Sequence, residues 1–456
     1  MPIITRFAPS PTGLLHLGGA RTALFNFIFA KSKNGKFKIR FEDTDKSRNQ
    51  KEVIDRIILD LKWLNIESDE KIIYQSDNIK NHIEFANSLV NNGLAYKCFN
   101  DENLMKNNEN KKNKIKSEWR DSKKKPPKNS KYCIRIKSPI NGSTYINDTI
   151  QGKVQIENIE LDDFVILRSD MTPTFLLSSV FDDYEMKVTD IIRGDDHLTN
   201  SLRQKVLFNF LDYSPNFSHI SLIHNEQNQK LSKRDMALSV NDYRGKGILA
   251  KSLINYLLRM GWSHGNQEFF TLNEAIKLFQ IKNIGKSPTR LDEKKLLFLN
   301  NFYIKSESDD SLYDEIQRLS SDQESNSLKK LKSKAILCIN LFKARCETIK
   351  DLKNKINFLI NSKIQLDSMD QEILNKSNNI KDEIISELSK INDWNEINLQ
   401  ETVKNIVNRL QLNFKQVAQP LRLSVCGQVN GPSVSSILFI LGKNEVLERI
   451  NKVWKI

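Results

Sequence analysis

Cysteine is scarce in this chain, with 5 residues among 456. The five are scattered as Cys98, Cys133, Cys338, Cys346 and Cys426, and they form no Cys-x-x-Cys pair or Cys/His cluster. Because structural zinc and iron–sulfur sites need such clusters, the sequence gives no positive indication of either metal centre. An odd number of scattered cysteines without a secretory signal also argues against a disulfide framework. We therefore expect a reduced, cytoplasmic protein and predict no bound metal.

Long apolar runs are also absent. No segment approaches the ~20 consecutive apolar residues that a membrane-spanning helix requires. The first residues, Met-Pro-Ile-Ile-Thr-Arg-Phe, lead directly into a predicted strand, so no targeting segment is visible. We therefore expect a soluble protein without a membrane partner.

The residues that are present are those of a large globular protein. Hydrophobic residues make up 39% and charged residues 28% of the chain. At about 100 to 200 residues per domain, its length predicts two to four domains. Lys and Arg outnumber Asp and Glu by 70 to 56, a net charge of +14, which favours a polyanionic partner and above all nucleic acid. Heavy use of lysine without such a partner would give the same surplus, so the charge leaves both interpretations open.

The N-terminal part has the pattern of a βαβ unit. Residues 3–8 and 37–42 are typical of short strands, and Ala20–Lys31 between them has apolar residues at helical spacing. A second amphipathic helix is predicted over Glu52–Leu64. Strands that alternate with helices predict a parallel sheet of the nucleotide-binding type. The expected fold of this part is therefore α/β.

The character of the sequence changes twice further along. Lys106–Lys131 is rich in lysine, which predicts either a solvated surface loop or an element that contacts RNA. Lys131–Ile192 supplies β-rich segments, and beyond residue 305 apolar residues recur every three or four positions. We expect an all-α domain in this last part, where the helix over Val434–Leu441 should end on Gly442.

One motif lies where the first strand should turn into its helix. It consists of Arg-Phe-Ala-Pro-Ser-Pro-Thr-Gly-Leu-Leu-His-Leu-Gly-Gly-Ala-Arg over residues 6–21. This is the phosphate-binding end of a parallel sheet, where a helix N-terminus favours negative charge. Gly18 and Gly19 would let a nucleotide approach the backbone, and His16 could donate a hydrogen bond to a phosphate oxygen. One histidine and two glycines at a turn are more often structural, so this motif alone is weak.

A second motif, Lys230-Leu-Ser-Lys-Arg234, follows a predicted strand over His219–His224. Its three cations and one hydroxyl could meet a triphosphate, and positioned ammonium groups would stabilise the charge that develops on a pyrophosphate leaving group. In isolation such a string is more often a solvated basic loop. The occurrence of both motifs in this order makes coincidence a poor explanation.

Together the two motifs resemble the paired signature sequences of class I aminoacyl-tRNA synthetases. The residues that resemble the glutamyl branch of that class are Arg6–Gly13, Arg40-Phe-Glu-Asp-Thr-Asp45, Ile192-Arg-Gly-Asp-Asp-His197 and Lys230–Arg234. The similarity also includes Tyr256–His264 and Gln419–Arg422. The N-terminal half carries the specific motifs, whereas the helical C-terminal third resembles the family more diffusely.

The resemblance implies a Rossmann-type parallel-sheet catalytic domain over residues 1–305, followed by an all-helical anticodon-binding domain over 306–456. Within the first domain it implies an α+β insertion at about 76–190 that binds the acceptor stem, and a stem-contact region at about 240–305. The implied reaction is activation of L-glutamate by ATP, with Mg²⁺, to glutamyl-adenylate, and transfer of the glutamyl group to tRNA(Glu). A cytoplasmic monomer is the family expectation.

The motifs also imply site residues. The residues that match the ATP site are Pro9, His16, Gly18, Gly19, Lys230, Leu231, Ser232, Lys233 and Arg234, and the catalytic ones among them are His16, Lys230 and Lys233. The residues that fall where the family binds glutamate are Arg6, Ser10, Glu42, Phe175 and Arg193. Two guanidinium groups can serve the two carboxylates of glutamate, and Glu42 can accept from its ammonium group. For any one of these charged residues, the alternative is a structural salt bridge.

Two departures from the family pattern stand out. Relatives that bind zinc hold it in a cysteine-rich knuckle within the insertion, but Cys98-Phe-Asn100 and the lone Cys133 cannot supply four ligands, so we predict no zinc. Phe175, in Thr172-Pro-Thr-Phe175, stands where the family usually presents a tyrosine toward the glutamate side chain. The alternative is that Phe175 is a core aromatic residue that faces away from the pocket.

Three other functions compete with this interpretation. Glutaminyl-tRNA synthetases that share the N-terminal architecture carry β-barrel anticodon domains, whereas residues 306–456 have helical spacing. A truncated paralogue that glutamylates a tRNA base lacks the C-terminal domain that this chain keeps. A non-enzymatic RNA-binding relative should have lost one of the two phosphate-contacting motifs, and both are present. The sequence leaves open whether tRNA(Gln) is charged as well.

Overall fold

The computed structural model describes residues 2–44, 51–99, 116–128, 130–225, 238–361 and 364–454. Lys230, Lys233 and the rest of the second motif lie outside the described residues, as do residues 106–115 and 129 of the basic segment. Contacts divide the chain into a sheet unit, residues 1–242 and 253–293, and a helical unit, residues 243–252 and 294–456. Among the described helices, none is long and apolar enough to cross a membrane.

The sheet unit alternates strands and helices. Its strands are β1 (Ile4–Phe7), β2 (Lys36–Phe41), β3 (Ile73–Tyr74), β4 (Ala95–Phe99), β5 (Tyr132–Ile136), β6 (Ser143–Asp148), β7 (Gly152–Glu157), β8 (Val165–Leu167), β9 (Asp190–Gly194), β10 (Asn216–Ile220), β11 (Ile223–His224) and β12 (Thr289–Arg290). Its helices are α1 (Leu17–Ser32), α2 (Lys51–Trp63), α3 (Ile79–Asn91), α5 (Phe175–Glu185), α6 (Leu198–Phe210) and α9 (Leu272–Leu278), with a 3-10 turn η3 (Asp195–His197). Helices α7 (Val240–Gly245) and α8 (Ala250–Arg259) run across the division between the units.

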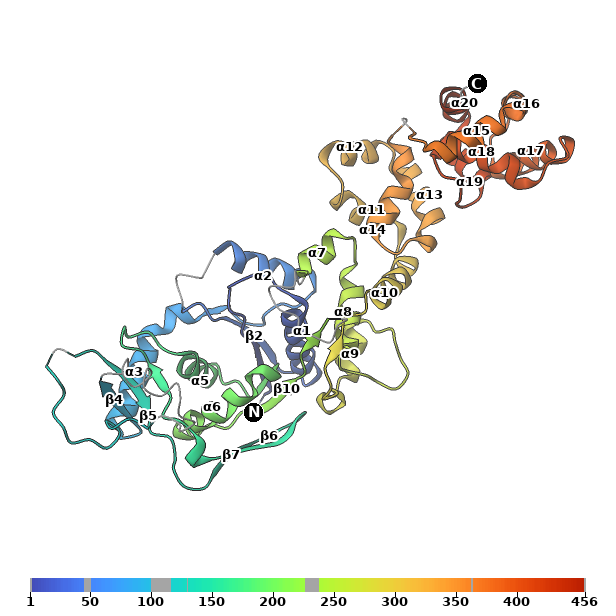
Figure 1. Ribbon diagram of the computed structural model, residues 1–456. Helices are drawn as coiled ribbons and strands as arrows, with labels where there is room; N and C mark the ends of the chain where they lie inside the picture. The colour runs from blue at the N-terminus through green and yellow to red at the C-terminus, as the bar shows by residue number, and fades with distance from the viewer. Residues whose placement is uncertain are drawn as a thin grey trace. The chain divides into compact units, whose positions relative to one another are not determined.

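A parallel sheet forms the base of this unit. β1, β2 and β3 are parallel neighbours, with Ile4 opposite Lys36 and Arg40 opposite Ile73. Helix α1 connects β1 to β2, as parallel neighbours require, and Figure 1 shows it beside β2. The predicted βαβ unit and its parallel sheet are therefore confirmed.

A second sheet lies beside β1 of the first sheet. Its order is β7-β6-β10-β9, with β9 and β10 parallel and β6 and β7 forming an antiparallel hairpin. The backbone N–H of Thr189, just before β9, donates to the carbonyl oxygen of Ile4 at 2.9 Å and brings β9 beside β1. The carboxyl ends of β1, β2 and β9 are therefore close together.

The predicted continuous strand over His219–His224 is wrong. β10 ends at Ile220 and β11 begins at Ile223, because the chain changes partner here: β10 pairs with β9, and β11 pairs with β12. The carbonyl oxygen of Ser221, between the two strands, accepts a hydrogen bond from Arg21 of α1. An apolar alternation cannot reveal such a change of partner.

The segment expected to be an α+β insertion contains both kinds of structure. An antiparallel sheet of order β4-β5-β8 lies with α3 and α5, and the β6–β7 hairpin follows β5 in the chain. Its apolar core includes Ile134, Ile166, Leu177 and Val180. The region is thus α+β, as predicted.

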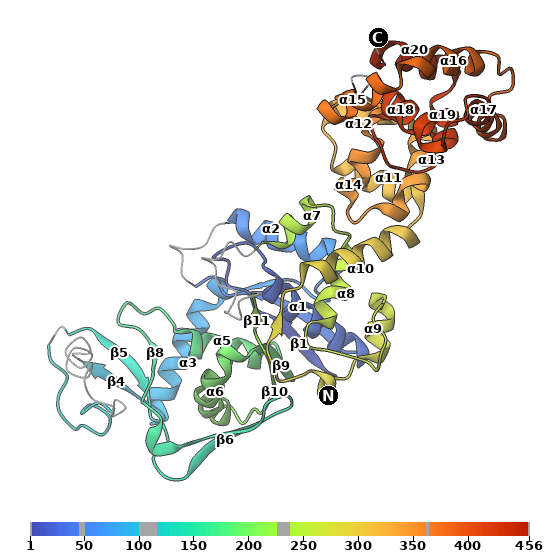
Figure 2. The same ribbon diagram turned by 45° about the vertical axis from the view of Figure 1, so that its right-hand side comes forward.

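The helical unit is built from short helices around one apolar core. These are α10 (Glu293–Ser306), α11 (Asp309–Arg318), α12 (Asp322–Lys330), α13 (Lys332–Phe342), α14 (Ile349–Ile356), α15 (Ser368–Lys376), α16 (Asn378–Ser389), α17 (Glu396–Arg409), α18 (Phe414–Cys426), α19 (Val434–Leu441) and α20 (Lys443–Val453). The apolar α19 packs against α13, α17 and α18 (Figure 2). It ends at Leu441, and Gly442 follows with φ +87°, which confirms the predicted helix end.

Candidate active site

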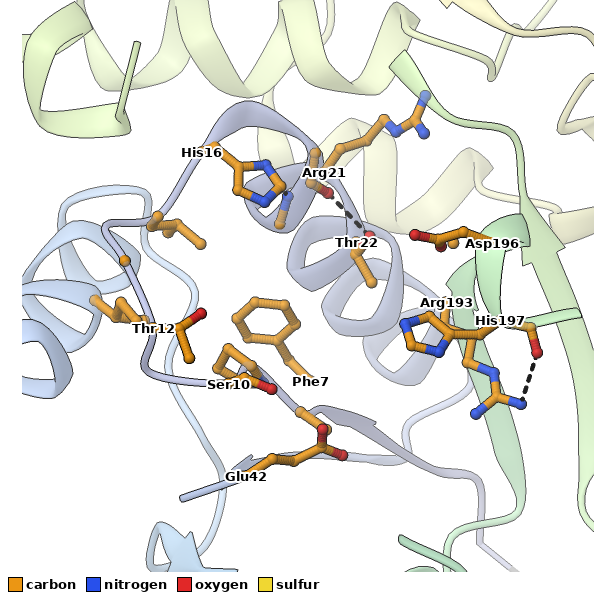
Figure 3. Close-up of a pocket in the computed structure, with 18 of the residues that line it drawn as sticks. Phe7, Ser10, Thr12, His16, Arg21, Thr22, Glu42, Arg193, Asp196 and His197 are labelled. Carbon is orange, nitrogen blue, oxygen red and sulfur yellow. Dashed lines mark hydrogen bonds between the residues drawn. The ribbon is translucent and has the colours of Figure 1, made fainter. Parts of the chain in front are cut away.

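A cavity of about 630 Å³ opens at the carboxyl ends of β1 and β9 (Figure 3). Its wall comes from the loop between β1 and α1, the first turn of α1, Glu42 just after β2, Phe175 of α5, and the end of β9. Parallel α/β sheets bind their ligands at this edge, where loops and helix N-termini converge. The lining is mixed, with charged, glycine and aromatic residues side by side.

The structure brings most of the predicted site residues together in this cavity. The lining residues that the sequence had indicated are Arg6, Pro9, Ser10, His16, Gly18, Gly19, Glu42, Phe175 and Arg193. The predicted residues Lys230, Leu231, Ser232, Lys233 and Arg234 lie outside the described residues. Phe175 is half-buried and its ring centroid lies 5.6 Å from that of His197, which also lines the cavity. Phe175 therefore faces the cavity and is not turned into the core.

His16 caps the N-terminus of α1. Its Nδ1 accepts a hydrogen bond from the backbone N–H of Gly19 at 3.2 Å. In the neutral ring the proton must then be on Nε2, so the imidazole can donate from that atom. A Cβ at Gly18 would lie 3.1 Å from the His16 ring, and one at Gly19 would lie 3.0 Å from the side chain of Leu15. Gly18 thus leaves room for the His16 ring and Gly19 for the Leu15 side chain, reasons that sequence analysis had not supplied.

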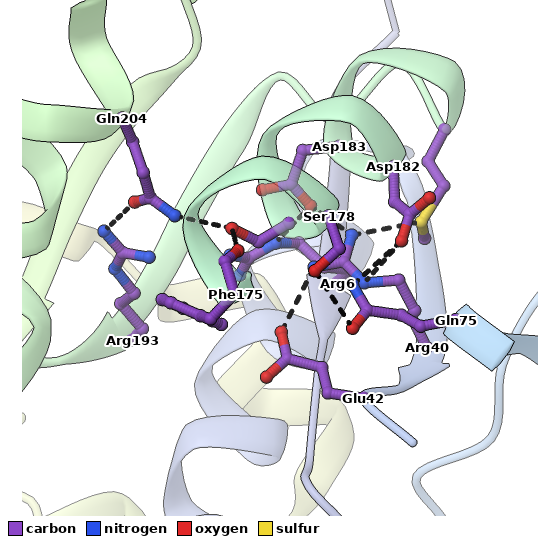
Figure 4. Close-up of polar contacts among 12 residues, drawn as sticks. Arg6, Arg40, Glu42, Gln75, Phe175, Ser178, Asp182, Asp183, Arg193 and Gln204 are labelled. Atoms are coloured by element: carbon purple, nitrogen blue, oxygen red, sulfur yellow. Dashed lines mark hydrogen bonds and ion pairs between the residues drawn. The ribbon is translucent and has the colours of Figure 1, made fainter. Parts of the chain in front are cut away.

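Arg6 is held by a buried carboxylate. Its Nε donates to Asp183 Oδ1 at 3.0 Å, and the Asp183 side chain is only 1% exposed. Arg40 donates to the same oxygen from its Nη1 (Figure 4). Burial by itself would raise the pKa of Asp183, but the two guanidinium groups outweigh burial and lower it. Asp183 is therefore an anion shared by two buried cations.

Glu42 joins the ion pairs of Arg6, Arg40 and Asp183 from the cavity side. Its Oε1 lies 3.4 Å from Arg40 Nη2, and its carboxyl group lines the cavity. Burial raises the pKa of Glu42, while Arg40 and Arg6 act in the opposite direction. A cationic group bound in the cavity would favour the ionised form of Glu42. The site therefore suits a ligand with an ammonium group near this carboxylate.

Behind Asp183, its neighbour Asp182 is fixed by three donors. Asp182 accepts from Gln75 Nε2 at 2.8 Å and from Asn78 Nδ2 at 2.7 Å, and it lies 2.7 Å from His82 Nε2. These contacts tie α5 to α3 and to the segment before it. They fix the turn of α5 that carries Asp183 toward Arg6.

Arg193 has partners of a different kind. Its Nη2 donates to Ser201 Oγ and to Gln204 Oε1, both at 2.6 Å, and its Nε donates to His219 Nε2 at 3.1 Å. All three are neutral groups when the histidine is unprotonated. Burial, and then the charge of Arg6, lower the pKa of Arg193 to about 9. A carboxylate bound in the cavity would supply the missing negative charge.

Several functional residues were missed by sequence reasoning. Arg21, which also lines the cavity, is buried and donates to the carbonyl oxygen of Met260 at 3.0 Å and to Thr289 Oγ1 at 3.1 Å. Burial lowers its pKa to about 10. Arg21 ends the first motif, and Asp183 follows another acid in α5, but neither position reveals its partner. Only long-range contacts identify their roles.

The antiparallel sheet of β4, β5 and β8 contains two facing cysteines. Cys98 of β4 is directly opposite Cys133 of β5, and both are buried. Within the described ranges, no group of three or more His, Cys, Asp or Glu side chains could hold a metal ion. The absence of zinc stays a prediction.

The comparisons with known proteins agree along the whole chain. Residues 2–298 match the family of class I tRNA synthetases (E and Q), catalytic domain, and residues 305–454 match an anticodon binding domain family. The chain is 44% identical to a glutamate–tRNA ligase 2 of Ehrlichia chaffeensis, over 98% of both chains. It is 39% identical to a glutamate–tRNA ligase of Pelagibacter ubique, over 99% of both chains.

A solved structure shows the same architecture. The chain resembles the crystal structure of a glutamate tRNA ligase from Elizabethkingia meningosepticum in complex with its amino acid, with a TM-score of 0.86 and 27% identity. The match covers 100% of this chain and 99% of that one. The family matches include both the sheet unit with its cavity and the helical unit. The chain therefore belongs to the class I tRNA synthetases of the E and Q group, in the branch of the glutamate–tRNA ligases.

Proposed function

We propose that this chain is a glutamate–tRNA ligase. It activates L-glutamate with ATP, taken as its Mg²⁺ complex, to glutamyl-adenylate and releases diphosphate. It then transfers the glutamyl group to the 3′-terminal adenosine of tRNA(Glu) and releases AMP. The full-length similarity to glutamate–tRNA ligases supports this reaction.

The observation that carries the proposal is the composition of one cavity. One part of its wall is a helix N-terminus with His16, Gly18 and Gly19, and another part holds Arg6, Glu42 and Arg193. Two guanidinium groups and one carboxylate complement the two carboxylates and one ammonium group of glutamate. The activated carboxylate must reach the α-phosphate of ATP, so both ligands have to share one cavity.

The proposed ATP site is the first motif together with the second. Pro9, His16, Gly18 and Gly19 would contact the nucleotide, with the helix N-terminus and the Nε2–H of His16 directed at phosphate oxygens. Lys230 and Lys233, with Leu231, Ser232 and Arg234, would stabilise the diphosphate as it leaves. Catalysis then depends on positioning and electrostatics, without a covalent enzyme intermediate.

The proposed glutamate site consists of Arg6, Ser10, Glu42, Phe175 and Arg193. Glu42 would accept from the ammonium group of the amino acid, and the guanidinium groups would bind its carboxylates. The other proposed partner is tRNA, in keeping with a net charge of +14. We place anticodon binding in residues 306–456, acceptor-stem binding at about 76–190 and stem contacts at about 240–305, and expect a cytoplasmic monomer.

A charging assay tests the proposed function. Purified full-length protein is incubated with ATP, Mg²⁺ and either glutamate or glutamine, in the presence of tRNA(Glu) or tRNA(Gln). We expect glutamate to be attached to tRNA(Glu) and glutamine to neither tRNA. Attachment of glutamine to tRNA(Gln) would instead identify a glutaminyl-tRNA synthetase, and no charging under any condition would contradict the proposal. Glutamate on tRNA(Gln) would extend the range of acceptors.

The variant Lys233→Ala tests the ATP half of the site. If Lys233 stabilises charge that forms only as diphosphate leaves, its loss should lower kcat much more than it raises KM for ATP. Steady-state charging kinetics with varied ATP measure both quantities. A kcat within about twofold of the wild-type value would contradict the assignment of Lys233.

A further inference from the structure

A buried chain of polar groups lies behind the cavity wall at Arg193. Asp148, at the end of β6, lies 2.6 Å from Nδ1 of His219, and Nε2 of His219 accepts from Arg193 Nε at 3.1 Å. Both the Asp148 and the His219 side chains are 0% exposed. The chain therefore joins the β6–β7 hairpin, through β10, to an arginine that lines the cavity.

Asp148 is held in its ionised form by several donors. Its carboxylate accepts from the backbone N–H groups of Ile150 at 2.9 Å, Gln151 at 2.8 Å and His219 at 3.0 Å. Burial would raise the pKa of Asp148, but the bond from His219 and these backbone donors lower it overall. An ionised carboxylate can only accept, so the Nδ1 atom of His219 must carry a proton.

This arrangement fixes the tautomer of His219. With the proton on Nδ1, the neutral ring presents a lone pair at Nε2. Arg193 Nε points a hydrogen at that atom, and Ser201 Oγ lies 2.9 Å from it. Ser201 and Gln204 of α6 hold the Nη2 end of the same guanidinium, so Arg193 is fixed at two of its three nitrogens. Its third nitrogen, Nη1, has no hydrogen-bond partner among the described residues, and Arg193 lines the cavity.

We propose that His219, oriented by Asp148, is the positioning residue that sets the affinity of this site for glutamate by holding Arg193 as an unneutralised cation. This proposal rests on the proposed function. A carboxylate in place of the imidazole would hold Arg193 equally well but would offset its charge, as Asp183 does in part for Arg6, with which Arg40 shares that carboxylate. A neutral acceptor fixes the guanidinium and leaves its charge for the carboxylate of the substrate.

The same geometry makes the site sensitive to acid. The charged and titratable groups that face His219 are Asp148 of β6, Arg193 of β9, and Asp195 and His197 of η3, while α6 presents the neutral Ser201. Burial lowers the pKa of His219 below its ordinary value, so the ring is neutral near pH 7. Protonation at lower pH would place a hydrogen on Nε2, break the bond to Arg193 and bring two cations together.

Two neutral variants of His219 separate its two bonds. In His219→Gln the side-chain oxygen can occupy the place of Nε2 and accept from Arg193, while the contact with Asp148 is lost. In His219→Asn the side-chain amide can occupy the place of Nδ1 and donate to Asp148, but nothing accepts from Arg193. Both remove a buried ring, so a purely structural role would affect them alike.

The experiment is tRNA(Glu) charging by the full-length variants, with glutamate varied at saturating ATP and tRNA. Wild-type activity with glutamate, measured first, establishes the proposed function independently. We expect His219→Asn to raise KM for glutamate about tenfold or more, as expected for loss of a hydrogen bond to a charged group, and His219→Gln to stay within about threefold of wild type. KM for ATP should change little in either variant.

A pH series completes the test. As pH falls below 7.5, KM for glutamate should rise more steeply for the wild type than for His219→Gln, because glutamine does not titrate, whereas Glu42 and His197 titrate in both proteins. Equal KM values for the two variants, or a wild-type KM for glutamate in His219→Asn, would overturn the proposal. So would an acid-side rise in KM that persists unchanged in His219→Gln, since another group would then be responsible.

Discussion

Arg6 and Arg193 line the same cavity, but the groups that hold them differ in charge. Arg6 is bonded to the buried carboxylate of Asp183, which it shares with Arg40. Arg193 is bonded to a histidine, a serine and a glutamine. The pKa of Asp183 is lowered by its two arginines, whereas burial lowers the pKa of Arg193 itself to about 9.

The two arginines therefore contribute to the protein in different ways, although both line the cavity. Arg6 belongs to an ion-pair network, so it contributes to the stability of the sheet unit as well as to the cavity. Arg193 is held by neutral hydrogen-bond partners, so its burial costs free energy that the more distant Asp183, Glu42 and Asp196 offset only in part and that a bound anion would offset further. We therefore expect changes on the Arg6 side to affect folding most, and changes on the Arg193 side to affect glutamate affinity most.

The largest effect on stability is expected for Asp183→Asn. This change leaves Arg6 and Arg40 buried without their shared anion, which should lower the free energy of unfolding by about 3 kcal/mol or more. Urea unfolding at pH 7.5 measures it, with Glu185→Gln, an exposed carboxylate on the same helix, as the matched control. A decrease in the free energy of unfolding no greater than that of the control would contradict the role of Asp183 as the shared anion of Arg6 and Arg40.

The same variant has a defined pH dependence. Because the folded-state pKa of Asp183 is lowered, its contribution to stability is present above the unfolded-state value of about 3.9 and is lost as pH falls through the folded-state value. The stability difference between wild type and Asp183→Asn should therefore be constant near neutrality and shrink only in acid. A difference that disappears already between pH 7 and pH 6 would point to another group.

Arg193→Ala should affect glutamate affinity more than it affects stability. Its hydrogen-bond partners are neutral, so its removal leaves no unpaired charge, and stability should fall by about 1–3 kcal/mol for the buried acceptors left without a donor, less than in Arg6→Ala. KM for glutamate should rise about tenfold or more, because a charge-assisted bond to the substrate is lost. Arg6→Ala should lower stability and glutamate affinity together.

The control for Arg193→Ala is Arg203→Ala, which removes a partly exposed arginine of α6 paired with Asp162. Thermal unfolding and charging kinetics on all three variants measure both properties. If Arg193→Ala proved as destabilising as Arg6→Ala, the distinction between the two sides would fail.

The smallest effect is expected for Phe175→Tyr. Phe175 lines the cavity, and we expect an added hydroxyl to supply one more donor for glutamate. A neutral hydrogen bond contributes about 0.5 to 1.5 kcal/mol, so KM for glutamate should fall by less than about tenfold with kcat nearly unchanged. No change in KM would place the hydroxyl outside contact with the substrate.

The local elements of the fold were predictable because they depend on near neighbours in the chain. Apolar spacing indicated β1, α1 and β2, and it also indicated the helices of the C-terminal unit and the end of α19 at Gly442. The change of partner between β10 and β11 was not predictable, since it depends on β12, which is distant in the sequence.

For the site, too, the motif residues could be predicted from the sequence, whereas their partners could not. The sequence by itself determined which residues stand in the motifs, and the resemblance of those motifs to a known family implied that Arg6, Glu42 and Arg193 belong to one glutamate site and His16 to the ATP site. Tertiary structure alone decided their partners, because Asp183 and His219 approach them from distant segments that carry no recognisable motif. The charge interactions of a buried group depend on the protein groups that replace its hydrating water. Most of those protein groups come from residues far apart in the chain.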